Sequence, residues 1–440
     1  MTSEELKQIK EKLQKVERES SNCIDFFLKQ YELLEEKNQC TLLTTIEKKQ
    51  IILVSEMKNI IEMLKRFPFN KIIWCSLLFY PVEFHEEKIL EYLAGELLHQ
   101  PTEIMILALK SWIEECGIEF TEKSLQIIYE LIEEIEKKCG EEQKELVIKI
   151  KELVKNVKSN ESEPTYKMKF DPAPISIEGK SIIFPQWMES QGYTVNILNK
   201  EFLEYAEQLM ICEYTFLRQL QPKDFYIYLF ESTRKNSNIM IYLDWCKRIS
   251  NWVAYAIIDQ KNEMIREMAF KNFLQLAIKC LEIKNFNSFV SIINGLKHYA
   301  LTRMTKTMSL RTPEEKILME ELISLQGKIL YTTMSIDYGK PTVPCLHYFL
   351  YEMNKIYEME YEIDETMNEI EEIEKIEKMI DLTKALQIGE YISLIKEYLN
   401  NDLSITINQK INEFFMKGLR HMKIDNSDLL KLSMDSEKVN

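Results

Sequence analysis

The chain has 440 residues, of which 45% are hydrophobic, and it contains only 10 glycines and 11 prolines. Both residues are scarce against average usages of roughly 7% and 5%, which disfavours a strand-rich or loop-rich protein and favours long helices. The formal net charge of −15 disfavours nucleic-acid phosphates and anionic lipid as partners. We therefore expect an all-α fold, no nucleic-acid partner and no direct insertion into a membrane.

Nine cysteines are spread along the chain, and none of them forms a CxxC pair. Most lie inside apolar helical patterns, which is typical of reduced core thiols and of a reducing compartment. The chain opens with an acidic segment, whereas a signal peptide opens with a basic one. These features predict a cytoplasmic protein.

Residues 1–154 are expected to form an N-terminal helical domain that begins with helices over 1–65. Apolar residues at 6, 9, 13 and 16 follow a 3-4-3 spacing, which suits a coiled coil but covers barely two heptads. An ordinary amphipathic helix is the favoured alternative. Further helices are expected over 104–112 and 121–135, on either side of a break at Gly117.

A polar stretch followed by prolines makes residues 155–190 the expected linker between two domains. The second domain is expected over 191–440 and to be helical, with one short strand at 193–198. A break inside this domain is expected at 339–344, where a glycine and two prolines follow closely.

The sequence lacks the common signatures of bond-making chemistry. Its five histidines form no HxxxH or HExxH pair, and no GxxxxGK[ST], GxGxxG or GxSxG motif occurs. We therefore expect no metal site, no cofactor and no enzymatic chemistry. The function class that remains is a helical surface that acts on another protein by its shape.

Five stretches, taken in order, carry a resemblance to one family. They lie at 202–225, 249–266, 285–303, 343–350 and 430–434. The third opens with the sequence Asn-Phe-Asn-Ser. Together they resemble the catalytic domain of the Ras-type guanine-nucleotide exchange factors. A looser resemblance, over 77–120, is to the Ras exchanger motif domain that precedes the catalytic domain in that family.

The resemblance implies two packed helical domains, with an antiparallel helical hairpin at about 346–399 projecting from the second. In the family this hairpin opens switch 1 of a Ras-family small GTPase and promotes GDP release and GTP loading. The nucleotide-free GTPase is then bound most tightly, and the exchange factor makes no bond of its own. The implied location is the cytoplasm, with recruitment to the membranes where the GTPase resides.

The resemblance also implies two catalytic positions on the outgoing helix of the hairpin. Glu358 falls at the family's carboxylate, and Asn354 falls at its hydrophobic residue that blocks the magnesium site. An asparagine there is a departure: either the register slips and Met353 or Ile356 takes the role, or the metal site is blocked differently. Glu358 also stands in an acid-rich run, which is typical of a solvated helix face.

The other residues implied by the resemblance fall into two groups. Contacts with the GTPase are implied for Val290, Lys297, Tyr299, Thr302, Leu346 and Lys384. Structural roles are implied for Asn285, Phe286, Asn287, Arg303, Pro344 and Gly389. Because Asn354 departs from the family, and Cys345 stands where an aromatic is usual, a catalytically silent scaffold that binds a GTPase without exchange is the rival hypothesis.

Overall fold

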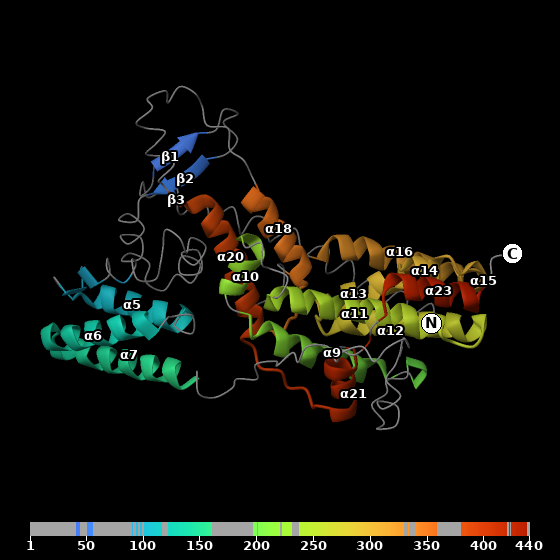
Figure 1. Ribbon diagram of the computed structural model, residues 1–440, viewed down its shortest axis with the longest axis horizontal. Coiled ribbons are helices and arrows are strands. Elements are labelled where there is room, and N and C mark those ends of the chain that lie inside the picture. The colour runs from blue at the N-terminus through green and yellow to red at the C-terminus, as the bar shows by residue number, and fades with distance from the viewer. Residues whose placement is uncertain are drawn as a thin grey trace, which may run out of the picture.

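The computed structural model describes the chain in separate ranges, which Figure 1 draws in colour. The described residues are 41–44, 51–55, 90, 94–95, 97–98, 101–116, 122–160, 197–199, 201–220, 222–230, 237–329, 333, 340–358, 380–419, 422 and 424–437. The helix predicted around residues 6–16, the part of the predicted linker from 161 to 190, and the tip of the predicted hairpin at 359–379 lie outside these ranges.

The prediction of an all-α fold is confirmed, because the described residues form helices apart from one small sheet. That sheet is antiparallel, in the order β1 (Thr41–Thr44), β2 (Ile51–Ser55) and β3 (Ile380–Asp381). The prediction of helices throughout 1–65 is wrong at β1 and β2. The β2 segment is an unbroken apolar run rich in β-branched residues, which favours a strand over an amphipathic helix. No helix in the described part of the chain is long and apolar enough to span a bilayer.

The helices predicted around 104–112 and 121–135 are confirmed as α5 (Glu103–Cys116) and α6 (Glu122–Lys138), and both pack on α7 (Glu141–Asn160). This group lies at the left of Figure 1. Its buried side chains include Trp112, Ile128 and Ile150, one from each helix. Since α7 continues to residue 160, the predicted linker begins inside a helix; the domain boundary itself stays a prediction.

The C-terminal part is a succession of helices and helical turns. They are η2 (Ile197–Asn199), α9 (Phe202–Leu217), α10 (Pro222–Phe230), α11 (Asn238–Ile258), α12 (Glu263–Glu282), α13 (Phe286–Leu296), α14 (Tyr299–Thr302), α15 (Thr305–Ser309), α16 (Pro313–Gly327), α18 (Leu346–Glu358), α20 (Leu382–Leu399), α21 (Gln409–Glu413), η4 (Phe414–Gly418) and α23 (Asn426–Ser436). The strand predicted at 193–198 is wrong where the structure describes it. Ile197 begins the 3-10 turn η2, and its carbonyl accepts a hydrogen bond from Asn272 Nδ2 (3.1 Å) rather than from a neighbouring strand.

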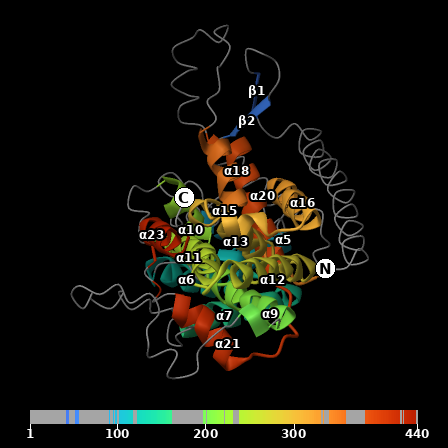
Figure 2. The same cartoon turned by 90° about the vertical axis from the view of Figure 1, so that its right-hand side faces the viewer.

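Aromatic packing joins the elements at the centre of the C-terminal part, where α9 and α13 pack against α12 and α13 also packs against α11 (Figures 1 and 2). The buried ring of Trp252 in α11 meets Phe273, Phe414 and Phe415, with centroid distances of 5.1, 5.7 and 5.6 Å. All three contacts are edge-on, the arrangement that the quadrupoles of the rings favour. Residues from α11, α12 and η4 therefore share one core.

Gly295 allows α13 to lie unusually close to α11. A Cβ atom added at this glycine would lie 2.5 Å from the backbone oxygen of Ser250 and 2.6 Å from Cβ of Val253. The same two helices are joined by Ser250, whose hydroxyl donates to the carbonyl oxygen of Ser291 at 2.8 Å. Any larger residue at position 295 would have to push the two helices apart.

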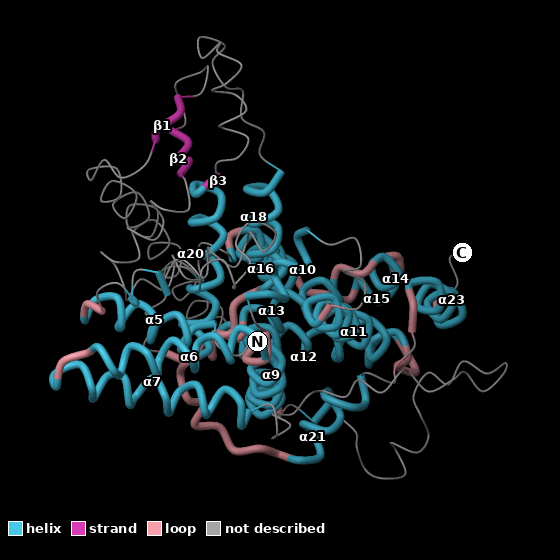
Figure 3. The backbone as a smooth tube through the Cα atoms, turned by 60° about the vertical axis from the view of Figure 1, so that its left-hand side comes forward, coloured by secondary structure: helices cyan, strands magenta, loops and turns pink. Residues whose placement is uncertain are grey.

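Helices α18 and α20 form the predicted antiparallel hairpin, which stands out from the rest of the C-terminal part (Figures 1 and 3). Helix α18 leaves the body at Leu346, and α20 returns to it. One face of α18 is buried through Leu346, Phe349, Leu350 and Met353. Phe349 also meets Tyr391 of α20 edge-on, with the ring centroids 5.7 Å apart.

Candidate functional site

The base of the hairpin is joined by its backbone to the turn before α13. The amide of Phe286 donates to the carbonyl oxygen of Val343 (3.0 Å), and the amide of Val343 donates to the carbonyl oxygen of Lys284 (2.9 Å). Between α12 and this bridge, Lys284 adopts a positive φ of 64°. A non-glycine residue in this region is held there by its surroundings at some cost in strain. The Asn-Phe-Asn-Ser turn and the start of the hairpin therefore form one unit.

The side chains of the turn are buried and make contacts within the protein. Asn285 caps α13, since its Oδ1 accepts from the amide of Ser288 (3.0 Å) and its Nδ2 donates to the hydroxyl of Ser288 (3.1 Å). Phe286 lies in the core. Asn287 and Ser288 both donate to the carboxylate of Glu213, with Nδ2 to Oε1 at 2.9 Å and Oγ to Oε1 at 2.8 Å.

Glu213 of α9 is the polar centre of this region, and sequence reasoning missed it. Its carboxylate is fully buried and also accepts from the hydroxyl of Tyr242 in α11. Burial raises the pKa of Glu213 to about 7, although the hydrogen bonds from Asn287, Tyr242 and Ser288 act in the opposite direction. One feature of the sequence could have indicated that Glu213 is buried: it is the one acid between residues 208 and 217, a stretch that is otherwise apolar or weakly polar.

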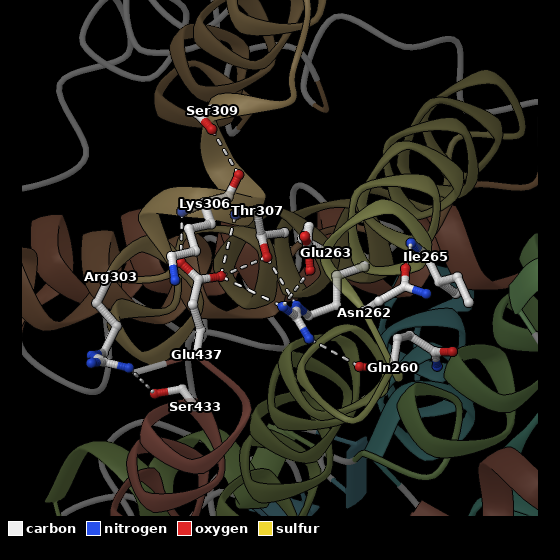
Figure 4. A network of polar contacts seen from close by, with 11 residues as sticks. Gln260, Asn262, Glu263, Ile265, Arg303, Lys306, Thr307, Ser309, Ser433 and Glu437 are labelled. Atoms are coloured by element: carbon white, nitrogen blue, oxygen red, sulfur yellow. Dashed lines mark hydrogen bonds and ion pairs between the residues drawn. The ribbon is translucent and has the colours of Figure 1, made fainter. Parts of the chain in front are cut away.

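A second buried polar group joins α12 to the C-terminal end of α23. Arg266 donates through Nε to Thr307 Oγ1 (2.9 Å), and its Nη2 lies 3.6 Å from Glu437 Oε2. Glu437 in turn accepts from the amides of Lys306 (2.6 Å) and Thr307 (3.2 Å), at the start of α15 (Figure 4). Nearby, Arg303 donates to the hydroxyl of Ser433 at 3.1 Å. These contacts attach the closing helix α23 to the body.

The implied contact residues around α14 differ in their exposure. Val290 is only 5% exposed and belongs to the core. Tyr299 is 47% exposed, and its hydroxyl donates to the carbonyl oxygen of Asn426 at 2.7 Å. Lys297 and Thr302 are exposed, and Lys297 Nζ lies 3.3 Å from Gln326 Oε1. Lys297, Tyr299 and Thr302 thus offer surface to a partner, while Val290 offers little.

The residues implied on the hairpin are likewise divided between surface and interior. Leu346 and Met353 are fully buried, Asn354 is half-buried, and Glu358 is exposed at the end of α18. Ile356 packs partly against the core. The alternative in which Met353 reaches the partner therefore lacks an accessible side chain, whereas Asn354 and Glu358 share one side of the helix.

The remaining implied residues on the hairpin lie at its base and within α20. Pro344 and Gly389 are buried, at its base and within α20. The backbone of Lys384 belongs to α20, but its side chain lies outside the described residues. In the described part of the chain, no group of three or more His, Cys, Asp or Glu residues is placed to hold a metal ion.

Comparison with known families identifies what this region is similar to. Residues 204–385 match the model of the RasGEF domain. That range runs from the first turn of α9 through α18 to the start of α20, and so contains both Glu213 and the base of the hairpin. The looser resemblance of residues 77–120 to a Ras exchanger motif lies outside the match and stays a prediction.

Relatives among known proteins agree with this match. The chain is 26% identical over 212 residues to Ras guanine nucleotide exchange factor Q of Dictyostelium discoideum, which covers 45% of the chain and 16% of the relative. It is 30% identical over 115 residues to human Rap guanine nucleotide exchange factor 6, covering 26% and 7%. It is 22% identical over 253 residues to the Ras-specific guanine nucleotide-releasing factor RalGPS1 of Danio rerio, covering 54% and 43%. The chain thus spans less than half the length of each of these relatives.

Proposed function

We propose that this protein is a guanine-nucleotide exchange factor that binds a Ras-family small GTPase and promotes GDP release and GTP loading. The observation that carries the proposal is the RasGEF match over 204–385, which coincides with a helical body and a projecting hairpin. The names of the relatives, all of them exchange or releasing factors, support the same activity. No bond needs to be made or broken by the protein itself.

The proposed mechanism uses the hairpin as a rigid wedge that opens switch 1 of the GTPase. An exchange factor that binds the nucleotide-free GTPase tightly must weaken nucleotide binding by the same factor, because the two binding equilibria are linked. Each tenfold acceleration of release requires about 1.4 kcal/mol of additional binding in the opened state. The backbone bridge between Val343 and the turn at 284–286 supports this role, since it fixes the hairpin base to the core.

Glu358 and Asn354 are the residues proposed to act on the nucleotide site. Both lie on the accessible side of α18, and Glu358 is the last residue of that helix. A carboxylate there would compete with a phosphate for the same positive region of the GTPase. Asn354 supplies an amide where the family resemblance implies an apolar side chain, so we propose that it disturbs the magnesium site by hydrogen bonding rather than by exclusion alone.

Asn354 also favours a second candidate function, a silent scaffold that binds the GTPase without exchange. A polar side chain at this position would leave the metal in place, and the GTPase would be held with its nucleotide still bound. The two candidates differ in one measurable respect, which is whether release of nucleotide accelerates on binding.

The deciding experiment uses the full chain and a panel of Ras, Rap, Ral and Rho-type GTPases loaded with a fluorescent guanine nucleotide. Exchange activity predicts faster loss of fluorescence for at least one GTPase, with excess unlabelled nucleotide present. Binding without faster release would support the scaffold. Neither binding nor release on the whole panel would reject both functions. We place the activity in the cytoplasm, at the membranes where the GTPase resides.

A further inference from the structure

The outer side of α18 carries an exposed aromatic residue that the proposed mechanism does not use. Tyr351 is 53% exposed, although it lies in the middle of a well-packed helix. The side of α18 that packs on the body consists of Leu346, Phe349, Leu350 and Met353, all at the spacing of one helical face. Tyr351 therefore lies on the opposite side and does not contribute to that packing.

Tyr351 shares its side of the helix with the two proposed catalytic positions. Since an α-helix has 3.6 residues per turn, residues 347, 351, 354 and 358 form one continuous stripe. Tyr351 and Glu358 are seven positions apart, which corresponds to about two turns and ~10 Å along the axis. Tyr351 lies one turn from Asn354 toward the hairpin base, so a protein surface that follows this stripe from Glu358 past Asn354 for one further turn covers Tyr351.

The ring of Tyr351 is held in place by its neighbours on the helix. Nζ of Lys355 lies 4.4 Å from the centroid of the ring, and the same ammonium group donates to Glu352 Oε1 at 3.0 Å. A cation over one face of the ring stabilises one orientation of the side chain. This leaves the second face, the edge and the hydroxyl of the tyrosine available, beside the only lysine of α18.

We propose that Tyr351 is a specificity-determining contact between the hairpin and its GTPase, and that Lys355 is the residue that positions the ring. Ordered tyrosines lose little conformational entropy on binding and are frequent among the residues that dominate protein interfaces. The surface that complements this stripe is an apolar patch of the GTPase with a carboxylate beside it, which suits both the ring and the ammonium group. This inference rests on the proposed function.

Helix α18 also supplies a matched control. Tyr357 is 40% exposed and belongs to the same helix. It follows Met353 by four positions and Leu350 by seven, so it continues the packed side of the helix and not the outer stripe. Removal of either tyrosine deletes the same chemical group, and only Tyr351 lies on the side of Glu358.

The test compares the full chain carrying Tyr351→Ala, Tyr351→Phe, Lys355→Met or Tyr357→Ala with the unaltered protein. The readouts on each panel GTPase are kcat and KM for nucleotide release, measured separately, and Kd for the nucleotide-free form. Tyr351→Ala should lower kcat/KM and weaken binding by at least about tenfold on the preferred GTPase, with a smaller loss on the others. Tyr351→Phe should stay within about threefold, because it retains the ring and its contact with Lys355.

The two other variants complete the test. Lys355→Met should raise KM more than it lowers kcat, since it loosens a binding contact. Tyr357→Ala should stay within about twofold. Equal effects of Tyr351→Ala and Tyr357→Ala, in a protein that accelerates release, would overturn the inference and leave the proposed function intact. If the unaltered protein binds without release, the Kd values alone decide; if it neither binds nor releases, function and inference fail together.

Discussion

Asn287 of α13 holds the carboxylate of Glu213 in α9, with its Nδ2 at 2.9 Å from Oε1 and 3.0 Å from Oε2. The two residues are 74 positions apart in the chain. A motif residue that marks the family resemblance therefore acts inside the protein, as a donor to a buried acid. Ser288 and Tyr242 also donate to this acid, and these hydrogen bonds favour its ionised form, but burial outweighs them and raises its pKa.

The first prediction concerns the pH dependence of stability. The pKa of Glu213 is raised from 4.5 to about 7 in the folded protein. A raised carboxyl pKa means that the folded state binds more protons than the unfolded state between these values, so stability falls as pH rises from about 4.5 to 7 and levels off above. The full contribution is on the order of 3 kcal/mol.

Glu213→Gln should flatten this dependence. Urea unfolding of both proteins between pH 5 and 8 measures it, as the difference between the two curves of unfolding free energy. Glu320→Gln, at an exposed position of α16, serves as the control and should reproduce the curve of the unaltered protein. A variant at position 213 whose curve runs parallel to that of the unaltered protein would contradict the prediction.

The second prediction concerns the close approach of α11 and α13. Gly295→Ala places a Cβ 2.5 Å from the backbone oxygen of Ser250, which a flexible side chain cannot relieve. We expect a loss of about 1–3 kcal/mol in unfolding free energy, the usual range for overpacking. Gly327→Ala is the control, because nothing lies within 4 Å of its added Cβ. Equal stability of the two variants would show that the helices separate without cost.

The third prediction concerns the buried ion pair at the end of the fold. Glu437→Ala removes the carboxylate near Arg266. It also removes the hydrogen-bond acceptor of the amides of Lys306 and Thr307. Removing one partner of a buried ion pair commonly costs about 3–5 kcal/mol. Thermal and urea unfolding should show this loss, whereas Glu263→Ala, whose half-exposed carboxylate lies 3.9 Å from the same arginine, should change stability by less than about 1 kcal/mol.

The fourth prediction concerns the proposed wedge. Glu358→Ala should slow nucleotide release by at least about tenfold while leaving the thermal midpoint nearly unchanged, because an exposed side chain contributes little to folding. Stopped-flow release of a fluorescent nucleotide measures the rate. Glu320→Ala, an exposed acid on α16, corrects for the loss of one negative charge. If both variants release nucleotide at the same rate, Glu358 takes no part in the mechanism.

Local patterns predicted the helices, because helix formation depends on neighbouring residues, whereas the hairpin was predicted only from the family resemblance. The stretch at 343–350 marked the start of the hairpin by that resemblance, and the cap at Asn285 follows from the preference of asparagine for helix starts. The strands β1 and β2 were missed although the apolar, β-branched run of β2 favours a strand. The pairing of β2 with β3, which is more than 300 residues away in the chain, is not visible in local sequence.

Burial was the harder property to predict from sequence. Val290 and Met353 stand in amphipathic helices where an apolar residue can face either the core or a partner, and the structure buries both. Glu213 was missed because an acidic side chain in a helix is normally expected to be exposed to solvent. Its role depends on donors from α11 and α13, whose approach to α9 is a matter of tertiary packing.

The backbone bridge at the base of the hairpin allows detachment of the hairpin to be measured by hydrogen exchange. The amides of Phe286 and Val343 are hydrogen-bonded only while the hairpin base is seated against the turn before α13. Their hydrogen-exchange rates therefore measure the free energy of hairpin detachment separately from that of global unfolding. Comparing the exchange rates of these two amides with and without a nucleotide-free GTPase would show whether the base of the hairpin stays attached to the core or detaches when the GTPase binds.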